Sequence, residues 1–311
     1  MAGSLTAGCG RPPAPPPPLL DSSIARSYAA ASAAAQALIG ADAADAAIEP
    51  QAIPLLLTHG RRTPQSVVLF HGFTNCPKQF AEFAQRLFAR GINVFVPRLP
   101  KHGYRDRLTR ALADLTVAEL QACAQNAATI GAGLGDRVTA LGLSLGGTMV
   151  CWLAQTQPID LAIPLAPFLA PSGYSESAAV NVARLLSALP SMYWWWDPRI
   201  RDKSLPLYAY PGYPTHALAE VIFLGDATFA LAKNGPPRAK RCDVVLNTTD
   251  PAINDDAVRA LLALWRAHGG STYRDIEWTD ILPVRHDVID PTTFPQARTL
   301  IYPRLEALIA G

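Results

Sequence analysis

A serine flanked by glycines is the part of this sequence that most directly suggests chemistry: Gly142-Leu143-Ser144-Leu145-Gly146. The pattern stands between a predicted strand and a predicted helix, which is the context that makes a G-x-S-x-G match meaningful. A tight turn at this point lifts the serine hydroxyl clear of the sheet, and the two glycines let strand and helix approach closely. Ser144 is therefore the candidate nucleophile, the alternative being a glycine-rich turn with an idle serine.

A serine hydroxyl is a poor nucleophile unless a general base can reach it. After a serine in this context, the acid and then the base follow along the chain. The helix dipole explains His268, which lies in the final turn of a predicted helix. His286 follows the last predicted strand, in a loop that would emerge at the carboxyl edge of the sheet, and is the candidate base; a merely solvated loop histidine is the alternative. The other histidines come before the last two predicted strands: His59, His71, His102 and His216.

The acid that would orient this base must also lie at the carboxyl edge of a strand, where sites in such sheets assemble. Asp250 follows a predicted strand and meets this condition, whereas Asp243 begins the same strand and would lie at the wrong edge. Asp255 and Asp256 are better explained as residues at a helix N-terminus. Asp250 is thus the candidate acid, accepting the ring N–H of His286 and stabilising the imidazolium.

Attack by a serine on a carbonyl also requires two preorganised hydrogen-bond donors for the developing oxyanion. The backbone N–H of Leu145, at the start of the predicted helix, is one candidate. The backbone N–H of Phe73 is the second, because it follows His71-Gly72 at the end of a buried strand. An ordinary β-turn is the alternative interpretation of that segment.

The elements that must position these residues alternate between strand and helix along the chain. Such alternation predicts an α/β fold with a mostly parallel central sheet and helices on both faces. The hydrophobic pattern predicts strands at 52–58, 66–70, 92–96, 138–143, 161–166, 243–247 and 271–278. Helices are predicted from Pro77 to Gly91, at 117–130, 145–155 and 255–267, and after Pro295.

Three segments are predicted outside or around this core. Residues 1–20 form a proline-rich spacer, and residues 21–50 form a peripheral Ala-rich helix that Ser22 or Ser23 would cap and Gly40 would end. The main α/β domain spans 51–311 and contains an inserted cap at about 168–241, where the alternation lapses. Aromatic residues of the cap could line a substrate pocket or pack on the sheet, and packing is the simpler interpretation: Phe168, Trp194, Trp195, Trp196, Tyr208 and Phe223.

Composition excludes several classes of function. Half of the residues are hydrophobic and only 17% are charged, so a chain of 311 residues buries a sizeable core. The net charge is only +2 and the arginines are spread along the chain, which makes nucleic acid an unexpected partner. The five cysteines form no C-x-x-C pair and have no histidine spaced for zinc, so no structural metal is expected, and free thiols are favoured over disulfides.

The sequence shows no uninterrupted run of 18 apolar residues, so no transmembrane span is expected. Leu5-Thr6-Ala7-Gly8-Cys9 resembles a lipoprotein cleavage box but lacks the basic and apolar regions of a signal peptide. Two interpretations stay open. Either the start lies within a longer signal peptide and Cys9 carries a lipid anchor in the cell envelope, or the match is accidental and the protein is cytoplasmic.

Taken together, these motifs resemble the α/β-hydrolase superfamily, especially bacterial carboxylesterases and monoglyceride-lipase-like serine hydrolases. The resemblance covers nearly everything from Ala52 to the C-terminus and includes Val96-Pro97-Arg98-Leu99-Pro100 followed by His102-Gly103. It implies a small-molecule carboxylic ester as substrate and a serine enzyme without metal or cofactor. Lys101 departs from the pattern, because relatives commonly have glycine there, which leaves the conformation of that loop in doubt.

The sequence thus predicts hydrolysis of a carboxylic ester through an acyl-serine intermediate. A peptidase or an acyltransferase on the same scaffold is the nearest alternative, since the triad serves both. A non-catalytic binding protein of the cell envelope that retains the fold is the alternative from another class.

Overall fold

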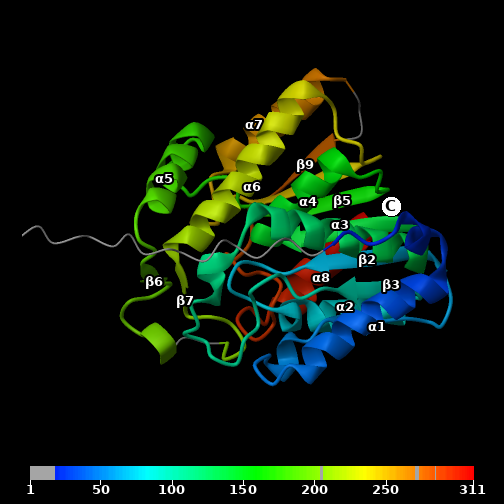
Figure 1. Ribbon diagram of the computed structural model, residues 1–311. Helices are drawn as coiled ribbons and strands as arrows, with labels where there is room; N and C mark the ends of the chain where they lie inside the picture. Colours follow the sequence, from blue (N-terminus) through cyan, green and yellow to red (C-terminus); the bar gives the residue numbers. More distant parts are fainter. Residues whose placement is uncertain (1–17, 204–205, 270–272, 284) are drawn as a thin grey trace, which may run out of the picture.

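The computed structural model of the chain describes residues 18–203, 206–269, 273–283 and 285–311. Its centre is a seven-stranded sheet with the order β1-β3-β2-β4-β5-β8-β9 (Figure 1). All neighbouring strands are parallel except β1, which pairs with β3 in the antiparallel sense. The strands are β1 (Leu55–Leu57), β2 (Thr63–Phe70), β3 (Asn93–Val96), β4 (Gly135–Leu143), β5 (Leu161–Leu165), β8 (Cys242–Asn247) and β9 (Tyr273–Trp278).

The central strands are buried on both faces, which is why they form continuous apolar runs in the sequence. Every residue of β5 and of β8 is buried, and so are the last five residues of β2. The edge strand β9 instead consists of exposed and partly buried residues up to its last residue, Trp278, which is buried. This sheet confirms the predicted α/β class with a mostly parallel sheet, and it brings the carboxyl ends of β2, β4, β8 and β9 to one edge.

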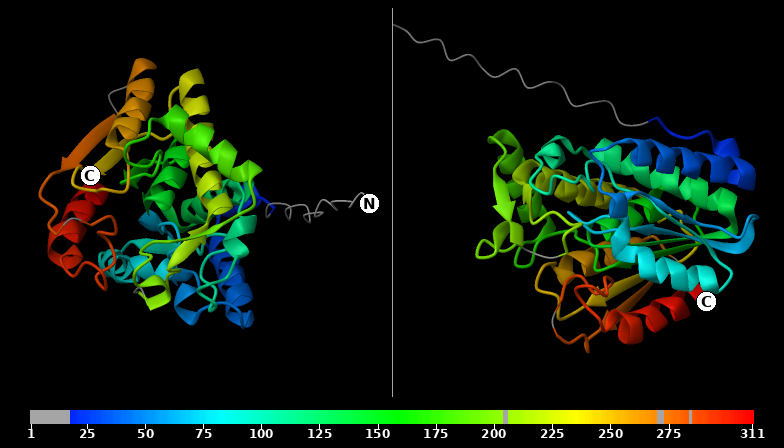
Figure 2. Two further views of the ribbon diagram at one scale, coloured as in Figure 1. Left: turned by 90° about the vertical axis from the view of Figure 1, so that its left-hand side faces the viewer. Right: turned by 90° about the horizontal axis from the view of Figure 1, so that it is seen from below.

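Helices cover both faces of the sheet, as the two further views in Figure 2 show. One hydrophobic core joins the sheet to α1, α3, α4, α6 and α7, and a second core joins it to α2 and α8 on the other face. Their bounds are α1 (Tyr28–Ala44), α2 (Ala81–Ala89), α3 (Val117–Leu134), α4 (Leu145–Thr156), α6 (Thr215–Asn234), α7 (Asp255–Ala267) and α8 (Tyr302–Ala310). Most of these bounds lie within a few residues of the predicted ones, and α7 matches its predicted range.

Between β5 and β8 the chain leaves the sheet, and we refer to this excursion, residues 168–241, as the cap. It contains α5 (Glu176–Ala188), the two-stranded antiparallel ribbon of β6 (Tyr193–Trp195) and β7 (Gly212–Pro214), and α6. Helix α5 packs on α6 through Ala179, Val180, Ala183 and Leu186. In Figure 1 α5, β6 and β7 lie to the left, beyond one end of the sheet.

The N-terminal helix differs from its prediction. Ser22–Arg26 form a separate short 3-10 helix capped by Asp21, and the long helix α1 begins after Ser27, whose side chain accepts a hydrogen bond from Ala30 N–H. Gly40 does not end α1, which continues to Ala44. The prediction was wrong because several cap-forming residues compete at the start, and because a glycine inside a long alanine-rich helix costs only about 1 kcal/mol. Cys9 and residues 1–17 of the predicted spacer lie outside the described residues.

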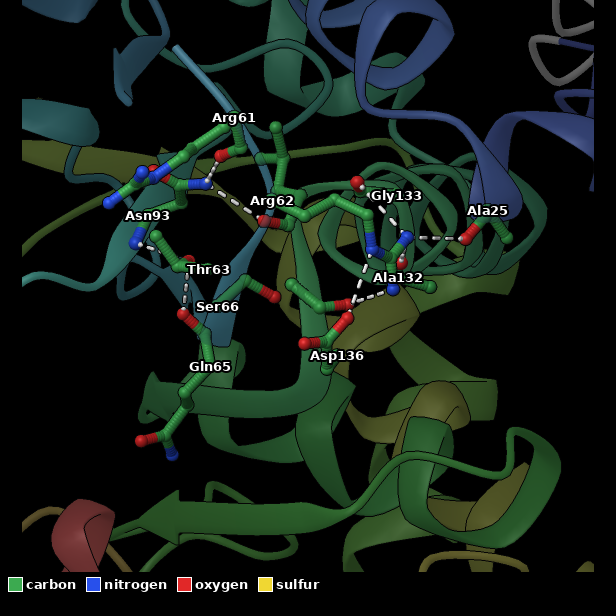
Figure 3. A network of polar contacts seen from close by, with 12 residues as sticks. Ala25, Arg61, Arg62, Thr63, Gln65, Ser66, Asn93, Ala132, Gly133 and Asp136 are labelled. Carbon is green, nitrogen blue, oxygen red and sulfur yellow. Dashed lines mark hydrogen bonds and ion pairs between the residues drawn. The ribbon is translucent and has the colours of Figure 1, made fainter. Parts of the chain in front are cut away.

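The edge of the sheet opposite the carboxyl ends is held by a polar network (Figure 3). The guanidinium of Arg62 donates to the carbonyl oxygens of Ala25, Ala132, Gly133 and Gly135 and pairs with Asp136 at 3.1 Å. These carbonyls include the last ones of α3, where a cation is favoured by the helix dipole. The network therefore fixes the short 3-10 helix Ser22–Arg26, the end of α3 and the start of β4 to one another at the edge away from the candidate site.

One described helix, α6, is long and apolar enough to cross a bilayer by length and composition alone. More than half of its most apolar window, 56%, is buried inside the fold. Its buried residues, including Ala217, Val221, Leu224 and Phe229, pack in the main core. Packing against α4 and α5 accounts for the apolar character of this helix.

Candidate active site

Ser144 occupies the turn between β4 and α4 in a backbone conformation that side chains rarely adopt, with φ 58° and ψ −116°. The turn is held by neighbouring backbone: Ser144 N–H donates to Leu165 C=O at 3.0 Å, and Ser144 C=O accepts from Phe168 N–H and Thr148 N–H. Such strain persists only where the surrounding structure enforces it, and it is typical of functional turns. The side chain of Ser144 is thereby presented at the carboxyl edge of the sheet, although the residue as a whole is only 6% exposed.

The two glycines around the serine are required by close backbone contacts. A Cβ atom on Gly142 would lie 2.3 Å from the carbonyl carbon and oxygen of Gly146. A Cβ atom on Gly146 would lie 2.1 Å from the carbonyl oxygen of Phe70, at the end of β2. Both distances are far below van der Waals contact, so the backbone crossing of β4 and α4 requires residues without a side chain.

The structure brings the candidate acid and base together. His286 Nδ1 lies 2.6 Å from Asp250 Oδ2, and the Asp250 side chain is inaccessible to solvent while that of His286 is 31% exposed. Because a carboxylate only accepts hydrogen bonds, this contact places the proton of a neutral imidazole on Nδ1 and leaves the Nε2 lone pair free. Ser144 and His286 both line the same two cavities at this edge. No hydrogen bond between their side chains is recorded in the described part of the chain.

The loop that carries His286 is tied to the end of β8 by a residue that the sequence analysis did not single out. Asn247, the last residue of β8, donates from Nδ2 to the carbonyl oxygen of Arg285 at 3.0 Å, and its Oδ1 accepts from the hydroxyl of Thr249. The hydroxyl of Thr249 also lies 3.2 Å from Ile281 C=O. These bonds hold the loop beside Asp250. A polar residue ending an otherwise apolar buried strand was the available signal.

The two candidate oxyanion donors come from two elements near Ser144: Phe73 lines both cavities with the serine, and Leu145 follows it in the chain. Phe73 follows the end of β2, and Leu145 is the first residue of α4. Among the described residues, no acceptor is recorded for the backbone N–H of either Phe73 or Leu145. Two amides without acceptors beside a strained serine are the arrangement that a developing oxyanion needs.

An apolar cavity of about 350 Å³ opens from Ser144 and His286 under the cap. Its wall is formed mainly by aliphatic and aromatic side chains of α5, α6, β6, β7 and the segments after β5 and β6. Among them are Phe168, Leu186, Trp194, Trp196, Tyr213 and Ile222. The sequence analysis favoured core packing for the aromatic residues of the cap; Phe168, Trp194 and Trp196 instead line this cavity, whereas Tyr208 and Phe223 do not.

A second cavity, of about 340 Å³, also has Ser144 and His286 in its wall and carries more polar side chains than the first. It is lined by the loop after β2, by the loop around His286 and by residues of the cap, among them Trp196 and Tyr210. Its polar residues are Asn75, Gln79, Arg285, Asp287 and Thr293. The sequence analysis did not identify these residues, which come from two distant segments and form no local motif. The candidate serine thus belongs to the walls of two cavities, an apolar one and a more polar one.

The cap is fastened to the loop after β2. The indole Nε1 of Trp196 donates to Thr74 Oγ1 at 2.8 Å, and Tyr210 N–H donates to Thr74 C=O at 2.8 Å. Thr74 has a positive φ of 65°, which is rare for a β-branched residue and is held by these contacts. The cap therefore touches the chain one residue after the candidate amide of Phe73.

Lys101, where the family pattern commonly has glycine, adopts the left-handed conformation that favours glycine, with φ 63°. Its ammonium pairs with Glu119 at 3.3 Å, and its carbonyl accepts from the hydroxyl of Tyr210 at 3.1 Å. The loop thus keeps a conformation suited to glycine, and the ion pair and hydrogen bond offset the strain of a side chain there.

Comparison with known proteins places the chain in a family. Residues 67–297 match the model of the alpha/beta hydrolase family, so the chain belongs to that family. Three solved structures illustrate the likeness. The first, of the metagenome-derived lipolytic enzymes LipS and LipT, is 20% identical, covers 85% of this chain and 99% of its own, and has a TM-score of 0.65.

A monoacylglycerol lipase from Paleococcus ferrophilus is 19% identical over 83% of this chain and 98% of its own, with a TM-score of 0.60. A soluble variant of the monoglyceride lipase from Saccharomyces cerevisiae, in complex with a substrate analogue, is 12% identical over 82% and 90%, with a TM-score of 0.56. At these identities the structures establish a shared fold. No match was found among curated proteins.

Proposed function

We propose that this protein is a serine esterase that hydrolyses carboxylic esters, with Ser144 as nucleophile, His286 as general base and Asp250 as the acid that orients it. The observation that carries the proposal is the contact of 2.6 Å between His286 and Asp250 beside a strained serine at the same sheet edge. The likeness to lipases and to the alpha/beta hydrolase family supports the same reaction class.

In the proposed acylation step, the Ser144 hydroxyl oxygen bonds to the ester carbonyl carbon while His286 Nε2 takes the hydroxyl proton. The carbonyl oxygen becomes an oxyanion that accepts hydrogen bonds from the amides of Phe73 and Leu145. The tetrahedral intermediate then collapses. The bond to the alkoxide breaks, His286 returns the proton to the leaving alcohol, and an acyl-Ser144 ester remains.

Deacylation repeats these steps with water in place of the serine. His286 removes a proton from water, whose oxygen bonds to the acyl carbon through a second oxyanion. Collapse releases the carboxylic acid and returns the proton to Ser144. Asp250 stays ionised throughout and stabilises the imidazolium formed in each step.

The two cavities indicate how an ester would lie across the serine. An aliphatic acyl chain fits the apolar cavity under the cap, where its burial is favourable by about 0.8 kcal/mol for each CH₂ group. The polar cavity then receives the alcohol, which leaves after acylation. This assignment favours esters of aliphatic acids over peptides, because the apolar cavity offers few hydrogen-bond partners for a peptide backbone.

Labelling with a fluorophosphonate tests the proposal. The wild-type protein should form a covalent adduct on Ser144 and turn over p-nitrophenyl esters, and Ser144→Ala and His286→Ala should do neither. Ester turnover retained by Ser144→Ala would exclude the mechanism. Turnover of peptide substrates in place of esters would point to a peptidase, and transfer of the acyl group to an added alcohol in preference to water would point to an acyltransferase.

A further inference from the structure

The oxyanion-binding loop and the histidine loop meet at one glutamine side chain. Gln79 is 2% exposed and belongs to the short helix Pro77–Phe80 that follows the loop after β2. Its Oε1 accepts a hydrogen bond from Gly72 N–H at 2.8 Å, and its Nε2 donates to Asp287 Oδ2 at 2.7 Å. Gly72 precedes Phe73, and Asp287 follows His286. One side chain therefore bridges the neighbours of two residues that the proposed reaction needs.

Hydrogen bonds on both sides of Gly72 hold the peptide that contains Phe73 N–H. Gly72 C=O accepts from Asn75 N–H at 3.2 Å and from His71 Nδ1 at 3.0 Å. The ring of His71 donates from Nδ1 because its Nε2 accepts from Leu99 N–H. In a planar trans peptide the N–H points opposite to the C=O, so bonds that fix Gly72 C=O also fix the direction of Phe73 N–H. Gln79 supplies the remaining bond, to Gly72 N–H.

Asp287 holds the other end of the bridge. Its Oδ1 accepts from Ile289 N–H and Asp290 N–H, each at 3.1 Å, and its Oδ2 accepts from Gln79 and, at 3.4 Å, from Asn75 Nδ2. These four donors are neutral amides. Burial and the nearby Asp290 carboxylate raise the pKa of Asp287. An ionised carboxylate at this position is therefore unfavourable in free energy, and its hydrogen bonds from Gln79 and from the backbone amides offset part of that penalty.

A carboxylate at position 287 determines which way the amide of Gln79 faces. Asp287 can only accept, so Gln79 must turn Nε2 toward it and Oε1 toward Gly72 N–H. An asparagine at 287 that keeps its oxygen on the backbone amides would present a donor to Gln79. Whichever way Gln79 then turned, one of the two contacts would bring two donors together, and one buried group would lose its partner.

We infer that Gln79 is a positioning residue that couples the direction of Phe73 N–H to the loop carrying His286 through its bonds to Gly72 and Asp287. The inference rests on the proposed esterase function. A displacement of about 1 Å in a reacting group can cost about 100-fold in rate. Gln79→Leu should therefore lower kcat by about 10- to 100-fold and change KM for the ester much less, because Gln79 lines the cavity assigned to the alcohol but not the apolar cavity assigned to the acyl chain.

A charge exchange across the bridge provides the decisive test. In Gln79→Glu two carboxylates face each other, and like charges at such a distance raise the pKa of the pair, so the bridge forms only while one proton is shared. The ratio of its kcat to that of wild type should fall as the pH rises.

In the double variant Gln79→Glu with Asp287→Asn, the carboxylate introduced at position 79 accepts from both Gly72 N–H and the new amide at position 287. The kcat of the double variant should therefore recover, with a ratio to wild type that is independent of pH.

Gln65 is a matched control, because its Nε2 makes two comparable bonds, to Thr139 Oγ1 and Ile309 C=O, away from the site. Gln65→Leu should lower thermal stability but leave kcat per folded molecule unchanged. If Gln79→Leu does not fold, the test rests on Gln79→Glu. The ratio of its kcat to that of wild type, measured across pH, compares the intact and broken bridge within one folded protein. A pH-independent ratio for that variant, or no recovery in the double variant, would overturn the inference.

Fluorophosphonate labelling separates this inference from the proposed function. Wild-type protein that fails to label at Ser144 would overturn both. Rapid labelling of wild type together with equally rapid labelling of Gln79→Leu and Gln79→Glu at pH 8 would overturn the role of Gln79 alone. We expect wild type to label and both variants to label more slowly in proportion to their loss of kcat.

Discussion

His286 Nδ1 and Asp250 Oδ2 lie 2.6 Å apart although 36 residues separate them in the chain, and the carboxylate of Asp250 has no contact with solvent. The acid follows β8 and the base follows β9, two strands paired in parallel from Cys242 and Tyr273 to Asn247 and Trp278. Parallel pairing brings both loops to the same edge of the sheet, which is why two residues so distant in sequence can form a hydrogen bond.

Asp250→Asn should lower kcat on esters by up to about 10⁴-fold, because an amide does not hold the required tautomer or stabilise the imidazolium. Steady-state kinetics on a p-nitrophenyl ester would measure the loss. Asp256→Asn is the matched control, since Asp256 is exposed in the first turn of α7 and pairs with Arg259 at 3.0 Å. Equal activity in the two variants would contradict the assignment of the acid.

Enlarging a small residue in the wall of the apolar cavity should shorten the preferred acyl chain. Ala179 on α5 lines the cavity and is 1% exposed, so Ala179→Leu adds three carbon atoms to a space of about 350 Å³. A panel of esters with graded acyl length should show kcat/KM falling for long chains and holding for short ones. Ala188→Leu, at the exposed end of the same helix, should leave the profile unchanged; an unchanged profile in Ala179→Leu would place the acyl chain elsewhere.

Two glycine substitutions should act in opposite directions. Gly142→Ala places a methyl group 2.3 Å from the Gly146 backbone and should abolish activity and sharply destabilise the fold. Gly40→Ala lies within α1 with nothing within 4 Å and should stabilise the protein by about 0.5–1 kcal/mol. Thermal unfolding of both variants beside wild type measures the two effects. A stable, active Gly142→Ala would mean that the turn around Ser144 relaxes more readily than its contacts indicate.

Stability should fall as the solution is acidified from pH 6.5 toward pH 4. Burial lowers the pKa of His102 to about 4 and the pKa of His71 well below its ordinary value of 6.5. The unfolded chain therefore binds protons in this window that the folded chain refuses, and protons favour the state that binds more of them. Each unit of pKa difference corresponds to about 1.4 kcal/mol.

Urea unfolding between pH 7.5 and pH 5.5 would measure this dependence before most carboxylates titrate. His102→Asn removes one of the two groups and should flatten the slope of unfolding free energy against pH. His59→Asn, which replaces an exposed histidine stacked on Phe88, serves as the comparison for a substitution outside the buried pair. A steep slope that survives in His102→Asn would assign the acid sensitivity to other groups.

The positions of the strands and of the candidate residues at their carboxyl ends could be predicted from the sequence, because both depend on local order. A fully apolar run of five or six residues followed by a polar turn identifies a buried parallel strand and the edge to which it leads. Ser144, Asp250 and His286 each follow a predicted strand, and the fold confirms those strands. The start of α1 was less determined, because Asp21 and Ser27 each cap a helix where Ser22 and Ser23 had been expected to do so.

The tertiary structure alone decided which cap residues form a wall and which fill the core. Aromatic side chains are equally suited to both, so sequence order could not separate Trp196, which lines the apolar cavity, from Phe223, which packs against the core. In the bridge from Gly72 through Gln79 to Asp287, the bond between Gln79 and Asp287 joins positions 208 residues apart. A hydrogen bond across such a separation leaves no local pattern, because its partners are chosen by the packing of loops and not by the periodicity of a helix or strand.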